Sequence, residues 1–349
     1  MLRRLACVSL FTVVSTAGVG FVEAQEPATI GRVTVLAGPQ RTDASDTLAA
    51  ALRTPFAAVR GRDGVIWVVE YDGGRILQLS EDGSVDFIAG SERRGLVDGR
   101  GETVRFNQLH NLAMNHRGMI YLSDHRNHVV RRLEIATGVV STLAGTGEPG
   151  FGGDGGSIST CQFQQPISVA ASRDGQSLYV ADIGNRRIRA IDLSNETIRT
   201  IAGTGRRGEP VDGAIAVESP LVDPRCVAED RDGNLWIVER GGHALRVIRD
   251  GRIYTVAGTG KPGYRDGAAM QAMFRGPKHV DVADDGRVYI ADDNNHAIRV
   301  YDPDRRSVET LDLDGFELER PHGVSVDGES LLIADSFHNR ILSVLIEDH

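Results

Sequence analysis

The chain repeats one pattern six times, and this repeat restricts the fold more than any other feature of the sequence. Each copy has a hydrophobic segment, a turn that ends in glycine, a second hydrophobic segment that ends in an acidic residue, and a polar loop. The turn glycines, 42 to 58 residues apart, are Gly64, Gly118, Gly175, Gly233, Gly286 and Gly328. The strand-ending acids follow in phase and are Glu70, Asp124, Asp182, Glu239, Asp292 and Asp335. Such a period holds about four short strands, as in a propeller blade.

The fourth segment of a copy indicates how the ring closes. Residues 139–145, 197–203 and 252–258 alternate β-branched residues and end in Ala-Gly, which favours half-buried strands. The sixth copy ends after its third segment, whereas residues 31–38 carry the same pattern near the N-terminus. We therefore predict an all-β fold, a six-bladed β-propeller with the N-terminal strand completing the last blade.

Residues 1–24 have the pattern of an export signal. Two arginines precede a short apolar run at 5–14, and small residues stand at the cleavage positions, 22–24. A membrane anchor is the competing interpretation, although small and polar residues follow the short apolar run. We expect residues 25–349 to form one propeller domain in the periplasm or the extracellular medium.

The composition restricts the partners. A formal net charge of -9 argues against general nucleic-acid binding, which requires a basic surface. No apolar run reaches the roughly 18 residues that a membrane span requires. We expect a monomer whose partner is an anionic small molecule or another protein.

Two segments resemble NHL repeats. They are Val-Ala-Asp-Ile-Gly-Asn-Arg-Arg-Ile-Arg at 180–189 and Ile-Ala-Asp-Asp-Asn-Asn-His-Ala-Ile-Arg at 290–299. Residues 144–155, Ala-Gly-Thr-Gly-Glu-Pro-Gly-Phe-Gly-Gly-Asp-Gly, resemble a phrase that is common in bacterial members of that family. The resemblance extends over nearly all of residues 25–349 and implies a six-bladed propeller of the bacterial exported type. It implies no single activity, because the same blade serves binding proteins and enzymes.

The long polar loops are expected on one face of the ring. In a four-stranded blade, the loop between the second and third strands shares a face with the connection to the next blade. Both classes are long and polar here, for example at 124–128, 292–296, 151–155 and 264–267, whereas the turns of the opposite face are short, as at 62–64. Functional loops concentrate on elaborated faces, so we expect the site on the loop-rich face.

The first strand of each copy would line the central channel and begin at the channel mouth. With the copies aligned on the proline that opens this strand (Leu109 in the second copy), the next residues are Phe56, His110, Ile167, Arg225, Lys278 and His322. The residues one position further are Ala57, Asn111, Ser168, Cys226, His279 and Gly323. We predict a site for a carboxylate, phosphate or sulfate formed by His110, Asn111, Arg225, Lys278, His279 and His322. Alternatively, Arg225 and Lys278 only pair with the acids that end the second strands.

A resemblance to the peptidylglycine-amidating lyases, a family of six-bladed NHL-like propellers, implies a channel zinc ion. Those enzymes hold the ion with three histidines that follow the proline in alternate blades. The chain has histidines at two of these positions, His110 and His322, and the resemblance implies that they are metal ligands. Arg225 stands in place of the third histidine, His279 is one residue out of phase, and Ile183 replaces a tyrosine of the lyases' third blade.

A divalent ion bound by carboxylates and amides, as in gluconolactonase-like propellers, is the second metal to consider. Asn111 is the only amide of the aligned ring, and Phe56 and Ala57 stand where an acidic ligand would be wanted. Calcium could also bind the Asp-Gly connections between the copies, at Asp154, Asp212 and Asp266.

Residues that recur in every copy have a structural role in our interpretation, because a catalytic residue is needed only once. The strand-ending acids recur in this way. Four of them precede an arginine by seven residues: Asp124 and Arg131, Asp182 and Arg189, Glu239 and Arg246, and Asp292 and Arg299.

Two cysteines follow the predicted signal, which contains Cys7. Cys161 and Cys226 belong to neighbouring copies on the loop-rich face, so we predict a disulfide bond between them in an exported protein. The alternative is two unrelated thiols, with Cys226 buried as a small hydrophobic residue.

Two functions stay open. The first is a propeller that binds a ligand or protein partner on its loop-rich face and channel mouth, and the absence of a complete catalytic motif favours it. The second is a channel-centred lyase or hydrolase that acts on an anionic small molecule. In it, His110 and His322 serve as bases or as ligands of a divalent metal, zinc or calcium, while Arg225 and Lys278 hold the substrate.

Overall fold

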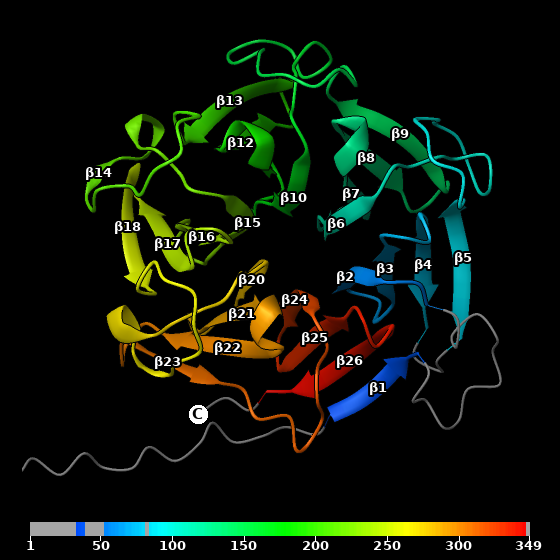
Figure 1. Ribbon diagram of the computed structural model, residues 1–349. Helices are drawn as coiled ribbons and strands as arrows, with labels where there is room; N and C mark the ends of the chain where they lie inside the picture. Colours follow the sequence, from blue (N-terminus) through cyan, green and yellow to red (C-terminus); the bar gives the residue numbers. More distant parts are fainter. Residues whose placement is uncertain (1–32, 39–51, 81–83, 347–349) are drawn as a thin grey trace, which may run out of the picture.

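The computed structural model describes residues 33–38, 52–80 and 84–346. Six β-sheets stand around a central axis as the blades of a propeller (Figure 1), which confirms the predicted fold class. The predicted export signal at 1–24 lies outside the described residues. No described helix is long and apolar enough to cross a membrane.

Each blade has four main strands in antiparallel order from the axis outward. Blade 1 is β2 (Pro55–Arg60), β3 (Ile66–Glu70), β4 (Arg75–Leu79) and β5 (Val85–Gly90). Blade 2 is β6 (Leu109–Met114), β7 (Met119–Asp124), β8 (Val129–Glu134) and β9 (Val139–Ala144). Blade 3 is β10 (Pro166–Ala171), β11 (Ser177–Asp182), β12 (Arg187–Asp192) and β13 (Thr197–Ala202).

The later blades add short outer strands and close the ring. Blade 4 is β15 (Pro224–Glu229), β16 (Leu235–Glu239), β17 (Ala244–Arg249) and β18 (Arg252–Ala257), with β14 (Ala214–Ile215) outside. Blade 5 is β20 (His279–Val282), β21 (Val288–Asp292), β22 (Ala297–Asp302) and β23 (Ser307–Thr310), with β19 (Gly267–Ala268) outside. Blade 6 is β24 (Pro321–Asp327), β25 (Ser330–Asp335), β26 (Arg340–Leu345) and β1 (Val33–Ala37).

Short 3-10 helices interrupt the polar loops and connections. They are η2 (His125–Asn127), η3 (Ile183–Asn185), η4 (Ala216–Glu218), η5 (Ala269–Gln271) and η6 (Asp293–Asn295).

The ring closes as the repeat predicts. β1 pairs antiparallel with β26, with Val33 opposite Val344 and Val35 opposite Leu342. β1 is the outermost strand of its sheet, so a segment from near the N-terminus completes blade 6 (Figure 1).

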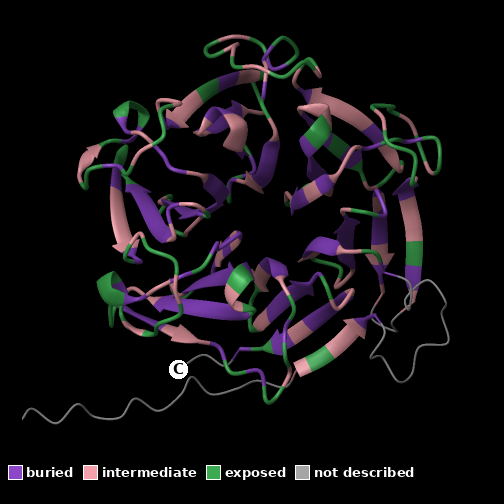
Figure 2. Cartoon of the chain, viewed as in Figure 1, coloured by how far each residue is buried: buried purple, intermediate pink, exposed green. Residues whose placement is uncertain are grey.

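The hydrophobic core lies between the blades. One cluster joins Trp236 and Val247 of blade 4 to Ile290 of blade 5, with Phe274 of the connection between them. Figure 2 shows buried residues on the inner and middle strands, and exposed residues mainly on the loops and outer strands. Each blade therefore packs its two faces against its neighbours.

The first strand of a blade carries a bulge at the channel mouth. Pro55 pairs with Glu70 and Ala57 with Val69, so Phe56 has no partner in the ladder. The same interruption leaves out His110, Ile167, Arg225 and His322. Because the start of the first strand pairs with the end of the second, the loop after the second strand lies at the same end. A bulge changes the direction of a side chain, and here it directs the side chains of these unpaired residues toward the mouth of the channel.

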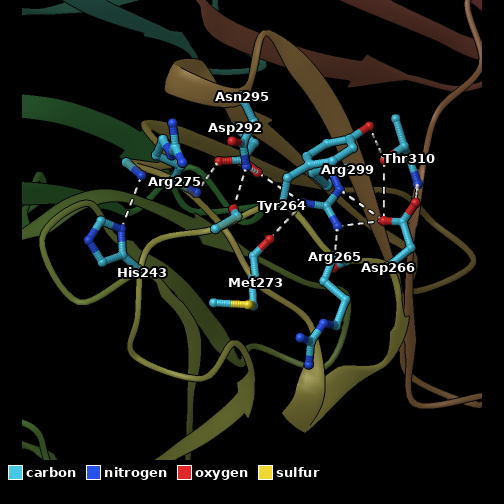
Figure 3. A network of polar contacts seen from close by, with 12 residues as sticks. His243, Tyr264, Arg265, Asp266, Met273, Arg275, Asp292, Asn295, Arg299 and Thr310 are labelled. Carbon is cyan, nitrogen blue, oxygen red and sulfur yellow. Dashed lines mark hydrogen bonds and ion pairs between the residues drawn. The ribbon is translucent and has the colours of Figure 1, made fainter.

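The strand-ending acids fasten the blades to the preceding connections, as Figure 3 shows for blade 5. Asp292 Oδ1 accepts a hydrogen bond from the Arg275 amide (2.8 Å), and Oδ2 accepts one from Arg299 Nη1 (3.0 Å). Arg299 also donates to Asp266 of the connection. The corresponding groups of blades 2 and 3 are Asp124, Arg131 and Asp98, and Asp182, Arg189 and Asp154. We call each group an acid–arginine clasp; it gives the strand-ending acids the structural role that the repeat predicts.

The predicted disulfide bond between Cys161 and Cys226 is wrong. Both are free, buried thiols. Cys161 Sγ donates a hydrogen bond to the Ile158 carbonyl (3.2 Å), and Cys226 Sγ accepts one from Ser168 Oγ (3.2 Å). The two side chains belong to different core clusters between blades, so neighbouring blades on one face do not bring them together.

Candidate functional site

Four of the six predicted ligand-binding residues lie in one group at the mouth: His110, Arg225 and His322 at bulges, and Lys278 directly before β20. Arg225 Nη2 lies 2.9 Å from His110 Nε2, and Lys278 Nζ lies 2.6 Å from His322 Nε2. The two imidazole rings are 6.0 Å apart between centroids. With Phe56, these residues form what we call the mouth cluster: Phe56, His110, Arg225, Lys278 and His322.

Phe56 and Tyr71 supply an aromatic wall. The ring of Phe56 stacks on Tyr71 at 4.3 Å on one side and on His322 at 3.8 Å on the other. His110 meets Phe56 edge-on at 4.8 Å. The sequence reasoning missed Tyr71, although it directly follows the strand-ending acid Glu70, the loop position that was considered only in the third copy. The wall offers a flat apolar surface beside the two cations.

Asp293 connects the lysine side of the cluster and was also missed. This fully buried carboxylate lies in η6, directly after the strand-ending acid of blade 5. Its Oδ1 is 3.1 Å from Lys278 Nζ and 3.2 Å from His322 Nδ1, and its Oδ2 accepts a hydrogen bond from Arg320 Nε at 2.7 Å. The sequence could have indicated Asp293, because only in the fifth copy does a second acid directly follow the strand-ending acid.

The alternative in which Arg225 and Lys278 pair with the strand-ending acids does not match the structure. Glu239 is bound by Arg246 at 2.7 Å, and Asp292 is bound by Arg299 in its clasp. Lys278 pairs instead with Asp293. Within the described residues, Arg225 has no ion pair and donates to a histidine.

Burial and neighbouring cations keep the imidazoles of the mouth neutral. Desolvation, together with the charge of Arg225, holds the pKa of His110 well below its usual range. Desolvation and Lys278 do the same for the pKa of His322. Because the cationic nitrogens are donors, each Nε2 accepts a hydrogen bond and each Nδ1 carries the proton. His322 Nδ1 donates to the Arg320 carbonyl at 3.2 Å.

The two cations respond differently to burial. Desolvation lowers the pKa of Lys278 to about 7, with Asp293 opposing the shift and Arg225 adding to it. Desolvation lowers the pKa of Arg225 to about 10, so its guanidinium stays charged at neutral pH. The mouth therefore has one permanent positive charge and one that titrates near neutrality.

Three buried polar atoms in or beside the cluster make no hydrogen bond, and one of them, Oδ1 of Asp293, is in an ion pair with Lys278. The other two are Nε of Arg225 and Nδ1 of His125, whose ring centroid is 5.8 Å from that of His110. Burial lowers the pKa of His125 to about 4. Buried polar groups are almost always paired, so unpaired ones call for a bound molecule or another explanation.

The other two predicted ligand residues lie deeper in the channel. Asn111 Nδ2 donates to His279 Nε2 at 2.7 Å, and Asn111 Oδ1 accepts a hydrogen bond from the Val169 amide at 2.9 Å. Both side chains line a cavity of about 320 Å³ inside the channel. They thus belong to another compartment than the mouth cluster.

The mouth does not fit a metal ion. Nε2 of His110 and of His322 each faces a cationic nitrogen, which would repel a metal cation. In the described part of the chain, no three histidine, cysteine, aspartate or glutamate residues form a group that could hold a metal. The channel zinc or calcium ion thus gains no support from these residues. Asp154 and Asp266 are bound by arginine in their clasps, and Asp212 accepts the Thr255 amide.

The NHL repeat family model matches residues 274–301, which run from the connection before β20 into β22. The chain is a six-bladed β-propeller that contains an NHL repeat. Suppressor of Quenching 1, a chloroplastic protein of Arabidopsis thaliana, is 26% identical over 313 residues, covering 68% of this propeller chain and 29% of that protein. NHL repeat-containing protein 2 of Homo sapiens is 26% identical over 316 residues, covering 76% and 43%. The chain spans less than half the length of these curated relatives.

Solved structures share the propeller fold of this chain at low identity. An auxiliary nutrient binding protein from Bacteroides thetaiotaomicron has a TM-score of 0.63 and 14% identity over 90% of this chain and 76% of that one. Virginiamycin B lyase from Staphylococcus aureus has a TM-score of 0.53 and 12% identity over 90% of this chain and 99% of that one. At this identity the likeness concerns the fold alone.

Proposed function

We propose that the propeller binds an anionic small molecule at the mouth cluster. Two buried cations support the proposal: Lys278, whose ion pair is with Asp293, and Arg225, which has no ion pair within the described residues. Arg225 has its Nε without a partner. A carboxylate, phosphate or sulfate would satisfy these donors with charge-assisted hydrogen bonds.

The surroundings of the cluster support an anion as well. Arg94 and Arg126 are exposed, and their charges act on the hydroxyl of Tyr71 beside the cluster. Neither has an ion pair within the described residues. A basic rim around buried donors would steer an anion toward the mouth. A flat part of the ligand would lie against Tyr71, because Tyr71 and His322 cover both faces of Phe56.

Titration calorimetry with phosphate, sulfate and citrate as probes tests the proposal. Arg225→Gln and Lys278→Met each remove one positive charge and should weaken the affinity about tenfold or more, since a hydrogen bond to a charged group contributes about 1.5–3 kcal/mol. Arg62→Gln, on the opposite face, should bind like the wild type. Binding that is absent in the wild type, or equal in all four proteins, contradicts the proposal. Binding of a protein partner but of no anion would also contradict it.

A lyase or hydrolase reaction is the second candidate, because the contact between Lys278 and His322 favours it. An amine with a pKa of about 7 is a general base near neutral pH. Lys278 would take a proton from the substrate, while Arg225 would hold the substrate's negative charge. The base, Lys278, and the cation that holds the substrate, Arg225, are thus two different residues of the mouth cluster.

Assays with carboxylate-bearing lactones and esters test this second candidate. Lys278→Met and His322→Gln should abolish turnover in protein whose unfolding midpoint shows an intact fold. Turnover that persists in both variants rules out this chemistry.

Export completes the proposal, and it rests on the signal pattern at 1–24. The full chain, expressed in a bacterium with two membranes, should appear outside the inner membrane with Gln25 as its first residue. An unprocessed chain in the cytoplasm, seen by mass spectrometry of the fractions, contradicts export.

A further inference from the structure

The inner strands of all six blades enclose a second compartment. A cavity of about 320 Å³ lies along the channel, toward the face opposite the mouth cluster. Ala113, Ala170 and Ala228, on three neighbouring blades, form part of its wall and leave space near the axis. Its volume is at the lower end of the range for ligand pockets, about 300–1,000 Å³.

Asp281 supplies a carboxylate in the wall of this cavity. Its Oδ2 accepts a hydrogen bond from the Val326 amide (2.8 Å), and its Oδ1 accepts one from the Val282 amide (2.9 Å). Asp281 has no ion pair within the described residues. Burial raises the pKa of this carboxyl above its usual value, because its charge is poorly solvated. An unpaired carboxylate in an enclosed space favours a positively charged guest.

The other charged groups of the lining leave an excess of negative charge. Glu229 accepts hydrogen bonds from the Tyr179 hydroxyl and the Arg173 amide, both at 2.7 Å. The guanidinium of Arg173 is held by Asp284 at 2.6 Å. Burial lowers the pKa of His279 to about 4, so this imidazole is neutral.

A layer of paired side chains separates the cavity from the mouth. Asn111 and His279 are hydrogen-bonded to each other at the inner end of the cavity, and Ser168 is bonded to Cys226 at the same level of the first strands. The cations Arg225 and Lys278 thus lie on one side of this layer and the unpaired carboxylate on the other. The channel has two compartments of opposite charge on one axis.

We propose that this cavity binds a small organic cation whose ammonium group contacts Asp281. An ammonium group needs only hydrogen-bond acceptors, which Asp281 and the hydroxyl of Ser325 in the lining provide. A metal ion fits less well, because the described residues contain no group of three metal-ligating side chains. The short alkyl part of the guest would lie against the alanines. This site goes beyond the anion site of the mouth and uses none of its residues.

Titration calorimetry with n-butylammonium, its neutral counterpart n-butanol, and calcium chloride tests the inference. n-Butylammonium should bind the wild type, and Asp281→Asn should bind it at least tenfold more weakly. Asp232→Asn removes an exposed acid from the same face and should bind like the wild type. Ala170→Leu fills the cavity without changing its charge and should also abolish binding of n-butylammonium. This variant tests the cavity if Asp281→Asn does not fold.

Each remaining outcome overturns the inference. One such outcome is a wild type that binds no n-butylammonium or that binds n-butanol equally well. Another is unchanged binding of n-butylammonium by both Asp281→Asn and Ala170→Leu. Tighter, Asp281-dependent binding of calcium would make the cavity a metal site instead. Phosphate or citrate titrations of the same variants report the mouth separately, so failure of one site is distinguishable from failure of the other.

Discussion

Two positions of the repeat differ in how much they vary among the blades. The strand-ending acid is similar in all six blades and is bound by an arginine in each. The residue after the strand-opening proline or leucine, at the mouth, differs from blade to blade and includes the two buried cations, Arg225 and Lys278. The strand-ending acid recurs because every blade must be held to its neighbouring connection. The residue at the mouth varies because a ligand occupies only one site.

Anion binding should weaken as the pH rises through neutrality. Lys278, with a pKa of about 7, is charged below that pH and neutral above it. Arg225, with a pKa of about 10, stays charged, and His110 and His322, with pKa values well below their usual range, stay neutral. Calorimetry with sulfate from pH 6 to pH 9 should show this loss, whereas Lys278→Met should show a flat profile. An affinity that rises over this range contradicts the assignment.

Both cysteines should be reduced and slow to react. Burial raises the pKa of the Cys161 and Cys226 thiols to about 11, which leaves little thiolate at neutral pH. A chain that begins at Gln25 should give two thiols in denaturant with or without reductant, and an alkylating reagent should label neither in the folded protein within minutes. A thiol count of zero before reduction would restore the disulfide.

The sequence predicted which residues reach the mouth, but not their depth or their partners. Alignment on the strand-opening proline was enough for His110, Arg225, Lys278 and His322. Asn111 and His279, one position further along the first strands, line the cavity deeper in the channel. Asp293 and Tyr71 come from loops, whose conformation no repeat pattern determines.

At the scale of the element, the acid–arginine clasps hold strands and connections together. Arg299 is fully buried and binds Asp292, Asp266 and the carbonyls of Arg265 and Met273. The sequence indicated that such acids are structural because they recur. It did not indicate that the aspartate of the connection is the third member, because that contact spans 33 residues of chain.

Arg299→Ala should lower the free energy of unfolding by about 3–5 kcal/mol, because it leaves the buried Asp292 carboxylate without its cation. Arg305→Ala, at an exposed ion pair 3.6 Å long, should stay within about 1 kcal/mol of the wild type. Denaturant unfolding followed by circular dichroism measures both. Equal stability of the two variants would show that the clasp contributes little.

Closure of the ring should depend on β1. Deletion of residues 1–38 removes β1 and exposes the edge of β26, which should lower the unfolding midpoint and promote association through the open strand. Deletion of residues 1–24 alone leaves β1 in place and should change neither property. Calorimetry and light scattering compare the two chains, and an unchanged midpoint after the longer deletion contradicts closure by β1.

At the scale of the whole molecule, the ring places six first strands side by side around one axis. Residues that are more than 200 positions apart in the chain, such as His110 and His322, therefore lie within 6.0 Å of each other between ring centroids. The blades are fastened at the same end, so we expect the backbone to move little when a ligand binds. The axis carries Arg225 and Lys278 at one end and Asp281 at the other, so we expect the two compartments to prefer ligands of opposite charge.

The most direct test of the anion site is a crystal structure of the protein grown with sodium selenate, whose selenium is located by anomalous scattering. We expect a selenate at the mouth, with oxygens within hydrogen-bonding distance of Arg225 Nε and Lys278 Nζ, and its loss in Arg225→Gln crystals grown alike. A mouth that stays free of selenate while the anion occupies other surfaces would contradict anion binding by the mouth cluster.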